Sequence, residues 1–409
     1  MARTTQAVIE QYERYVMNTY ARSPLVLTKA KGSRIWDVEG HEYLDLFPGW
    51  GVGGLGYNHP WVITAIRGQA GRILHVANNY YHPVQWRAAK KLVEVSFDGK
   101  VFFTNSGAEA VETAVKLTRR WGTRAYGASG GAGGRYEIIT MERSFHGRTM
   151  AALSATGQTK HRQGFEPLVP GFVHVPFNDL EAVRRAVTPK TCAVLVEPIQ
   201  GEGGVHAASR EFLTGLRRLC DERNLLLIAD EIQTGMGRTG TWFAYQPSGI
   251  EPDVLLLAKT LGGGFPIGAV VAKRDVADLL TPGTHATTYG GSPLGCACIL
   301  AVFEAIEKQK LLARVNTLAP FLFKRLEALK RRVPIIREVR GRGFMVGVEL
   351  TIEGKPVVDA CRAKRLLINC TQGNVLRLLP AMTITKPQLS RGLAILEEVL
   401  RATAETGSS

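Results

Sequence analysis

The sequence lacks the features that mark membrane and secreted proteins. None of its 409 residues lies in an uninterrupted apolar run of about 18 residues, the length that a membrane span requires. Glu13, Arg14 and Arg22 interrupt the start of the chain, which excludes the apolar core of a signal peptide. The six cysteines form neither a disulfide framework nor a zinc spacing, since their one close pair, Cys296 and Cys298, cannot hold a metal alone. We therefore expect a cytoplasmic, soluble protein with free thiols, no metal and no membrane partner.

Long basic runs are also absent, although the formal net charge is +15. Lysine and arginine occur in short groups such as Lys90-Lys91, Arg119-Arg120 and Arg331-Arg332, and no run reaches five. A protein that binds nucleic acid concentrates such charge against phosphates. The dispersed charge instead favours a field that attracts small anionic substrates. A basic nucleic-acid-binding protein stays open as the non-enzymatic alternative.

Short apolar runs separated by helical patterns predict the fold class. Hydrophobic residues make up 45% of the chain, which is enough for a large core. Strand-like runs that are apolar on both faces lie at 137–141, 172–176, 193–197, 225–230, 254–259 and 268–272. Between two of them, residues 209–223 carry apolar side chains at helical spacing. This alternation predicts an α/β domain with a mainly parallel sheet between helix layers.

The pattern also predicts how the chain divides into domains. We expect residues 61–310 to form the large α/β domain, and residues 1–60 and 311–409 to contribute to a smaller α+β domain. Residues 122–134 are rich in glycine and lack apolar periodicity, so we interpret them as a surface loop. They contain no G-x-G-x-x-G motif, which argues against a dinucleotide site there.

Two of the strand-like runs end in side chains of opposite charge. Asp230 directly follows one apolar run, and Lys259 directly follows another. Ligands in open α/β sheets bind beyond the carboxyl ends of the strands, so we expect this carboxylate and this amine in one crevice. Taken singly, each is equally compatible with an ordinary strand that reaches solvent.

A turn of small residues supplies a third element of a site. Asn105-Ser-Gly-Ala-Glu109 leads into a helical pattern, and a helix start presents free N–H groups to a phosphate, although these residues also suit an ordinary cap. A phosphate site, a carboxylate and an amine together fit pyridoxal phosphate. Asp230 would keep the pyridine nitrogen protonated, and Lys259 would carry the cofactor as a Schiff base.

Ordered motifs along nearly the whole chain resemble those of the class III aminotransferases, which are pyridoxal-phosphate enzymes of fold type I. The motifs are Tyr43-Leu-Asp45, Gly56-Tyr-Asn-His-Pro60, Asn105-Ser-Gly-Ala-Glu-Ala110, Ser144-Phe-His-Gly-Arg-Thr149, Glu197-Pro-Ile-Gln-Gly-Glu202, Asp230-Glu-Ile-Gln-Thr-Gly-Met-Gly-Arg-Thr-Gly240, Ala258-Lys-Thr-Leu-Gly-Gly-Gly264, Thr288-Tyr-Gly-Gly291 and Leu376-Arg-Leu-Leu-Pro380. Within the family, segment 75–85 is most similar to the acetylornithine branch. The resemblance implies a homodimer whose active site lies at the subunit interface.

The resemblance also implies a set of cofactor contacts. They are Ser106, Gly107, Ala108, Phe145, Asp230, Ile232, Gln233, Lys259 and, from the second subunit, Thr288. In this set Phe145 would stack on the cofactor ring, and Gln233 would hydrogen-bond to its phenolic oxygen. The backbone N–H groups of Gly107 and Ala108 would bind the phosphate.

Four further residues have implied roles in substrate binding. Arg148 would bind the substrate α-carboxylate with Thr287 beside it, and Arg377 would bind a carboxylate of 2-oxoglutarate. Glu202 would shield Arg377 while the amine donor is bound. The sequence departs from the family pattern at Thr287, where acetylornithine enzymes usually have serine. Trp50 lies where ornithine aminotransferase has a tyrosine, which argues against free ornithine as the donor.

The reaction implied is transfer of the distal amine of an N-acylated diamino acid, N2-acetylornithine first, to 2-oxoglutarate. Its products would be N-acetylglutamate semialdehyde and glutamate, as in arginine biosynthesis and also in lysine biosynthesis. Alternative donors are ornithine, succinylornithine, 4-aminobutyrate and carrier-linked lysine. The same fold type also supports decarboxylation, racemisation and isomerisation.

Overall fold

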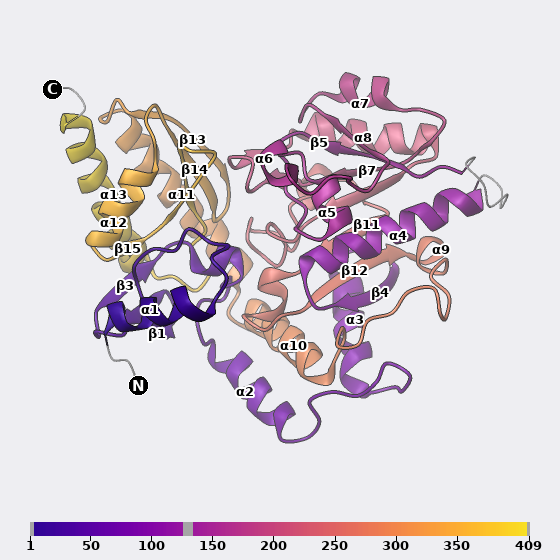
Figure 1. Ribbon diagram of the computed structural model, residues 1–409, viewed down its shortest axis with the longest axis horizontal. Coiled ribbons are helices and arrows are strands. Elements are labelled where there is room, and N and C mark those ends of the chain that lie inside the picture. The colour runs from indigo at the N-terminus through magenta and orange to yellow at the C-terminus, as the bar shows by residue number, and fades with distance from the viewer. Residues whose placement is uncertain (1–3, 126–133, 407–409) are drawn as a thin grey trace.

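A seven-stranded sheet forms the centre of the protein, whose computed structural model describes residues 4–125 and 134–406 (Figure 1). In spatial order its strands are β4 (Gly99–Thr104), β12 (Gly268–Lys273), β11 (Val254–Leu257), β10 (Leu226–Asp230), β7 (Thr191–Val196), β5 (Glu137–Met141) and β6 (Phe172–Val175). The pairings from β11 to β6 are parallel, and only β12 runs against its neighbours β11 and β4. The expected α/β class with a mainly parallel sheet is therefore confirmed.

Helices cover both faces of this sheet, which explains why its strands are apolar on both sides. Helix α4 (Gly107–Ala125) packs its buried face on β11, β12 and β7. Helix α8 (Arg210–Arg223) covers the opposite face with Phe212, Leu213, Leu216 and Leu219. Its first turn is fixed by the Ser209 hydroxyl, which accepts a hydrogen bond from the Phe212 N–H at 3.0 Å.

Two local expectations need correction. Strand β11 ends at Leu257, so Lys259 lies in a separate 3₁₀ turn, η3 (Lys259–Gly262), instead of at the strand end. The supposed loop at 122–134 begins inside helix α4, because that helix continues to Ala125. Gly122 allows this extension: a Cβ there would lie 2.1 Å from the Arg135 carbonyl oxygen. Residues 126–133 of the segment lie outside the described residues.

The two ends of the chain meet in smaller sheets beside the central one (Figure 1). One sheet contains β1 (Leu27–Lys31), β2 (Arg34–Asp37), β3 (Glu42–Asp45) and β15 (Leu366–Leu367), with β15 parallel to β3. The other contains β13 (Ile336–Arg342), β14 (Met345–Leu350), β17 (Val375–Leu378) and β16 (Asn369–Thr371), all antiparallel. Helices α11 (Leu311–Lys330), α12 (Lys355–Ala363) and α13 (Lys386–Thr406) pack around them. The boundaries near residues 60 and 310 stay a prediction.

The remaining elements connect these layers. They are α1 (Thr5–Tyr15), η1 (Pro48–Gly51), α2 (Pro60–Ala70), α3 (Pro83–Val95), α5 (Met150–Ala155), α6 (Thr159–Arg162), α7 (Leu180–Ala186), β8 (Ile199–Gln200), β9 (His206–Ala207), η2 (Gln246–Ser248), α9 (Arg274–Ala277) and α10 (Pro293–Lys308). Within residues 4–125 and 134–406, no helix has the length and apolar character needed to cross a membrane.

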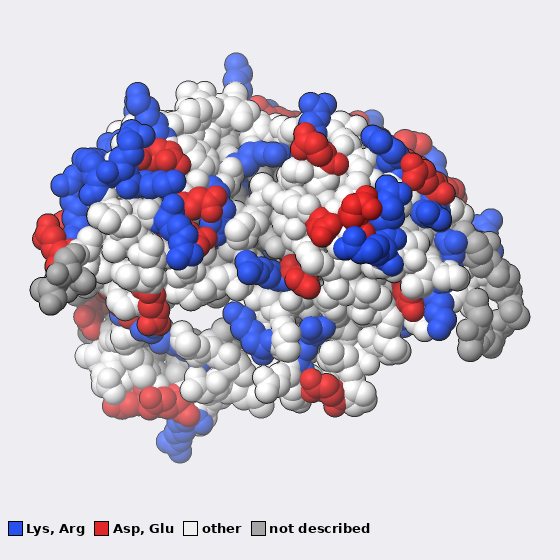
Figure 2. All heavy atoms as spheres, turned by 90° about the horizontal axis from the view of Figure 1, so that it is seen from above, with Lys and Arg blue, Asp and Glu red and all other residues white. Residues whose placement is uncertain are grey.

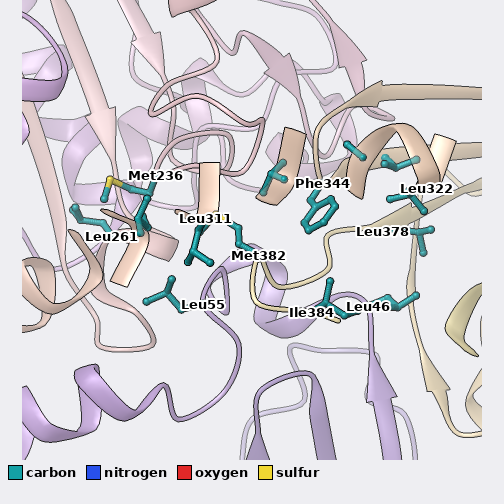
Figure 3. Close-up of a cluster of buried hydrophobic side chains, with 14 of the residues drawn as sticks. Leu46, Leu55, Met236, Leu261, Leu311, Leu322, Phe344, Leu378, Met382 and Ile384 are labelled. Atoms are coloured by element: carbon teal, nitrogen blue, oxygen red, sulfur yellow. The ribbon is translucent and has the colours of Figure 1, made fainter. Parts of the chain in front are cut away.

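One hydrophobic core joins the central sheet to the smaller sheets (Figure 3). Leu46 and Leu55 from the N-terminal part pack into the same cluster as Leu261, Phe344 and other residues of the middle and C-terminal parts. Burial of each large side chain stabilises the fold by on the order of 2 kcal/mol. This burial fixes the segment before η1, and also strand β17, against the central sheet. Residues that are far apart in the sequence are thereby held around one cavity.

Candidate active site

A cavity of about 590 Å³ opens beyond the carboxyl ends of the central strands. Asp230 enters it from the end of β10, and Lys259 enters it from the turn after β11. The start of α4 and the loop after β5 complete the wall with Gly107, Phe145 and Arg148, among others. The carboxylate and the amine expected in one crevice therefore line the same cavity.

The backbone of Lys259 has an unusual conformation. Its φ of 49° is in the left-handed region, which is costly for a residue with a side chain and is concentrated at functional sites. Thr260 anchors the turn because its hydroxyl donates a hydrogen bond to the Gly51 carbonyl at 3.0 Å. Burial lowers the pKa of the Lys259 amine, although the nearby Glu202 carboxylate opposes this effect. The neutral amine, which acts as a nucleophile or base, is thus easier to form here than in an exposed lysine.

Asp230 belongs to a chain of buried polar groups that the sequence reasoning missed. Its Oδ2 lies 2.8 Å from Nδ1 of His146, and Nε2 of His146 lies 3.2 Å from the Thr140 hydroxyl. Its Oδ1 accepts a hydrogen bond from the Ile232 N–H at 3.1 Å. These contacts fix the carboxylate in a single orientation toward the cavity. The signal for His146 was its place inside the Ser144–Thr149 motif.

The first turn of α4 lies at the cavity wall, where a phosphate site is expected. Ser106 caps the helix, since its hydroxyl accepts a hydrogen bond from the Glu109 N–H at 3.2 Å. Among the described residues no acceptor occupies the N–H groups of Gly107 or Ala108, which both line the cavity. Gly107 lies directly against Ile232: a Cβ at this glycine would approach the Ile232 side chain to 2.9 Å. Free donors and the positive end of the helix dipole favour a phosphate here.

Glu197 connects two walls of the cavity and was not singled out from the sequence. One carboxylate oxygen accepts the Phe145 N–H at 2.8 Å, and the other accepts the Gly201 N–H at 3.2 Å. Burial raises the pKa of Glu197 to about 7. Beside Phe145, the guanidinium of Arg148 lies 5.6 Å from the ring centre and is exposed to solvent. Phe145 and Arg148 therefore face the cavity together.

Arg377 and Glu202 form an ion pair at the rim. Nη1 of Arg377 lies 2.7 Å from Oε1 of Glu202, and the arginine side chain is fully buried. Burial would raise the pKa of the Glu202 carboxyl, but Arg377 outweighs it and lowers this pKa, so the pair is ionised. Glu202 lines the cavity, whereas Arg377 is not among the described lining residues. The carboxylate thus covers the guanidinium, and its role in shielding Arg377 while the amine donor is bound stays a prediction.

Of three other expected residues, two are hydrogen-bonded within this chain and one is exposed. The Gln233 amide donates to the Trp50 carbonyl at 3.3 Å, and its oxygen accepts from Arg377 at 3.4 Å. The Thr287 hydroxyl accepts a hydrogen bond from the Asn105 side chain at 3.1 Å. Thr288 is exposed, and neither threonine is among the cavity-lining residues that the structure describes. The roles of these three residues toward cofactor and substrate stay predictions.

Many basic side chains on the face drawn in Figure 2 lie close to acidic ones. Several basic groups are paired outright, as in the contact of Arg274 with Asp98 at 2.7 Å and that of Lys364 with Glu398 at 2.7 Å. Such pairing reduces the charge available to bind phosphates.

The geometry around the cavity fits pyridoxal phosphate. A fixed carboxylate suits the pyridine nitrogen, an amine with a lowered pKa suits the aldehyde, and the unoccupied N–H groups of α4 suit the phosphate. Fold and site together define a pyridoxal-phosphate enzyme of fold type I.

Comparison with known proteins agrees with this class. Residues 15–400 match the family described as aminotransferase class-III, so the chain belongs to that family and is a pyridoxal-phosphate-dependent aminotransferase. It is 46% identical over 394 residues to the acetylornithine aminotransferase of Caldanaerobacter subterraneus subsp. tengcongensis, covering 96% of this chain and 99% of that protein. The corresponding protein of Methanocaldococcus jannaschii is 46% identical over 391 residues, covering 96% of this chain and 97% of that protein. A solved ornithine aminotransferase from Toxoplasma gondii, with pyridoxal phosphate at partial occupancy, has a TM-score of 0.94 at 34% identity and covers 100% and 96% of the two chains.

Proposed function

We propose that this aminotransferase transfers the distal amine of N2-acetylornithine to 2-oxoglutarate, giving N-acetylglutamate semialdehyde and glutamate. The observation that carries the proposal is that only one of two arginines near the cavity is paired with a carboxylate. Arg148 has no carboxylate partner among the described residues, whereas Arg377 is covered by Glu202. A donor with one carboxylate far from its reacting amine suits Arg148 alone. An acceptor with two carboxylates suits both arginines once Glu202 has moved away.

The acyl group has a role in this assignment. Free ornithine carries an ammonium next to its α-carboxylate, so that ammonium would lie near the guanidinium of Arg148. Like charges at such a distance repel, and acylation removes the ammonium. The proposed donor therefore keeps the carboxylate that Arg148 attracts and loses the charge that it repels. The related acetylornithine aminotransferases support the same donor.

Different residues of the chain would have different roles in the reaction. When bound, pyridoxal phosphate supplies an electron sink for the charge that develops as the substrate carbon loses its proton. Asp230, held by His146, would keep the pyridine nitrogen protonated. The Lys259 amine would hold the cofactor in the resting enzyme and, once displaced by the donor, would move the proton at its Nζ atom. Phe145 would hold the ring by stacking, and Gly107 would hold the phosphate.

A screen of single half-reactions tests the donor. The holoenzyme is mixed with N2-acetylornithine, ornithine, succinylornithine, 4-aminobutyrate or lysine without an acceptor, and the change in cofactor absorbance is followed. We expect acetylornithine to have the highest second-order rate constant. A higher constant for ornithine or 4-aminobutyrate would contradict the proposed donor. It would leave the aminotransferase class unchanged.

We also propose that the active enzyme is a cytosolic homodimer whose partner subunit completes the phosphate site with Thr288. Thr288 is exposed, and the side chains of Tyr80, Tyr81, Trp86 and Tyr289 are exposed as well. Exposed apolar groups of this size favour a protein interface. The six cysteines are free, which suits a reducing compartment.

Light scattering tests the assembly. It should give about twice the 44.7 kDa chain mass, since we propose two subunits. Mixing two inactive variants, Lys259→Ala and Thr288→Arg, should restore activity, because one site of each mixed dimer receives both native residues. A monomer with full activity would refute the homodimer.

A further inference from the structure

Asn369 holds the guanidinium of Arg377 on the side away from Glu202. Its Oδ1 lies 2.9 Å from Nη2 and 3.3 Å from Nε of Arg377. Strand pairing causes this contact, since Asn369 lies directly opposite Arg377 in the β16–β17 ladder. The residue opposite Arg377 on the other neighbouring strand, β14, is Gly347, which has no side chain to offer.

The guanidinium has separate partners for separate edges. Asn369 accepts from the edge formed by Nε and Nη2, while Glu202 accepts from Nη1. The rings of Phe47 and Trp50 lie over the guanidinium, with ring centres 4.8 Å and 5.7 Å from its central carbon. The plane of the group is thus set by the rings, and its rotation within that plane is set by Asn369.

The Glu202 and Asn369 contacts of Arg377 respond differently when a carboxylate of the acceptor binds. Glu202 must leave Nη1, because the incoming carboxylate needs the same donor. Asn369 is uncharged and binds the opposite edge, so the incoming carboxylate neither repels it nor competes with it. With it in place, the end formed by Nη1 and Nη2 is directed at the ligand. Without it, the Nε and Nη2 hydrogens would be buried and unpaired, and once Glu202 departs only the Gln233 oxygen, 3.4 Å from Nη1, would remain to orient the group.

We propose that Asn369 is a positioning residue for the acceptor half-reaction: it keeps Arg377 oriented while Glu202 is displaced. This inference rests on the proposed function, in which Arg377 binds a carboxylate of 2-oxoglutarate. During the donor half-reaction Glu202 still holds Nη1, so a guanidinium that has lost Asn369 keeps its charged partner. The consequence is an effect on one half-reaction and not on the other.

The test compares Asn369→Leu, which keeps the side-chain size and removes the acceptor, with Asn374→Leu. Asn374 lies in the same β16–β17 hairpin and donates to the Leu350 carbonyl at 2.8 Å, away from Arg377. The probe is glutarate, a dicarboxylate without the reactive carbonyl, and its binding to the holoenzyme is measured by calorimetry. The donor half-reaction is followed separately through the cofactor absorbance.

We expect Asn369→Leu to weaken glutarate binding about tenfold or more, because a charge-assisted contact is roughly twice as strong as a neutral one and depends on alignment. Its donor half-reaction should stay within about twofold of the native enzyme, since Glu202 then holds Arg377. Asn374→Leu should leave both unchanged. Asn369→Ala provides a second variant with the same expectation.

The outcomes separate the two proposals. Native glutarate affinity in both Asn369 variants overturns the positioning role, as does an equal loss in the two half-reactions, which marks a merely structural residue. A native holoenzyme that does not bind glutarate overturns the assignment of a dicarboxylate acceptor, and the role of Asn369 falls with it. A different preferred amine donor contradicts only the proposed donor.

Discussion

Replacing Glu202 with glutamine should make the enzyme bind dicarboxylates more tightly. In the native protein an incoming carboxylate must displace Glu202 from Arg377, whose side chain is fully buried, and this contact spans 2.7 Å. A glutamine amide would still accept a hydrogen bond from the charged guanidinium but would lack the ion–ion attraction; because hydrogen bonds to charged groups range from about 1.5 to 3 kcal/mol, the amide should be displaced at a cost lower by about 1.5 kcal/mol. That difference corresponds to about tenfold tighter binding.

Calorimetric titration of the Glu202→Gln holoenzyme with glutarate measures this gain directly. Glu304→Gln is the matched control, because Glu304 pairs with Lys308 on the surface of α10 and is not among the described residues that line the active-site cavity. The control should bind glutarate with native affinity. Weaker or unchanged binding in Glu202→Gln would refute the idea that Glu202 competes with the ligand for Arg377.

Three further predictions concern other features of the site and the core. Burial raises the pKa of Glu231 from its ordinary 4.5 to about 7, so the folded protein loses stability as the pH rises from 4.5 through 7. Glu231→Gln should remove up to about 3 kcal/mol of this loss, measured as the free energy of unfolding in urea at several pH values. An equally steep profile in that variant would contradict the prediction. Gly107→Ala should weaken cofactor binding about tenfold in reconstitution titrations, because the new Cβ would meet Ile232 at 2.9 Å; Gly68→Ala, where nothing lies within 4 Å, is its control and should bind normally. Lys259→Ala should reduce turnover by at least about a thousandfold in steady-state assays, and normal activity would exclude Lys259 as the acid-base group.

The regular elements could be predicted because their patterns are local. The runs at 137–141 and 268–272 became β5 and β12, and the pattern at 209–223 became α8, since burial on one or two faces imposes a period that one sequence displays. The ends of these elements were predicted less well. Lys259 lies in a left-handed turn after the strand, where the next residue, Thr260, is hydrogen-bonded to the Gly51 carbonyl. Helix α4 continues past Gly122, which has no side chain to meet the Arg135 carbonyl oxygen.

The sequence by itself determined the chemical types at the site: an amine, a carboxylate and a helix start after three apolar runs. Family resemblance added which arginines and which glutamate to consider. Only the tertiary structure decided how they are coupled, because His146 reaches Asp230, Glu197 reaches Phe145, and Asn369 reaches Arg377 through strand register and packing. Such contacts join residues from distant parts of the chain, and a linear pattern carries no record of which side chains meet across a fold.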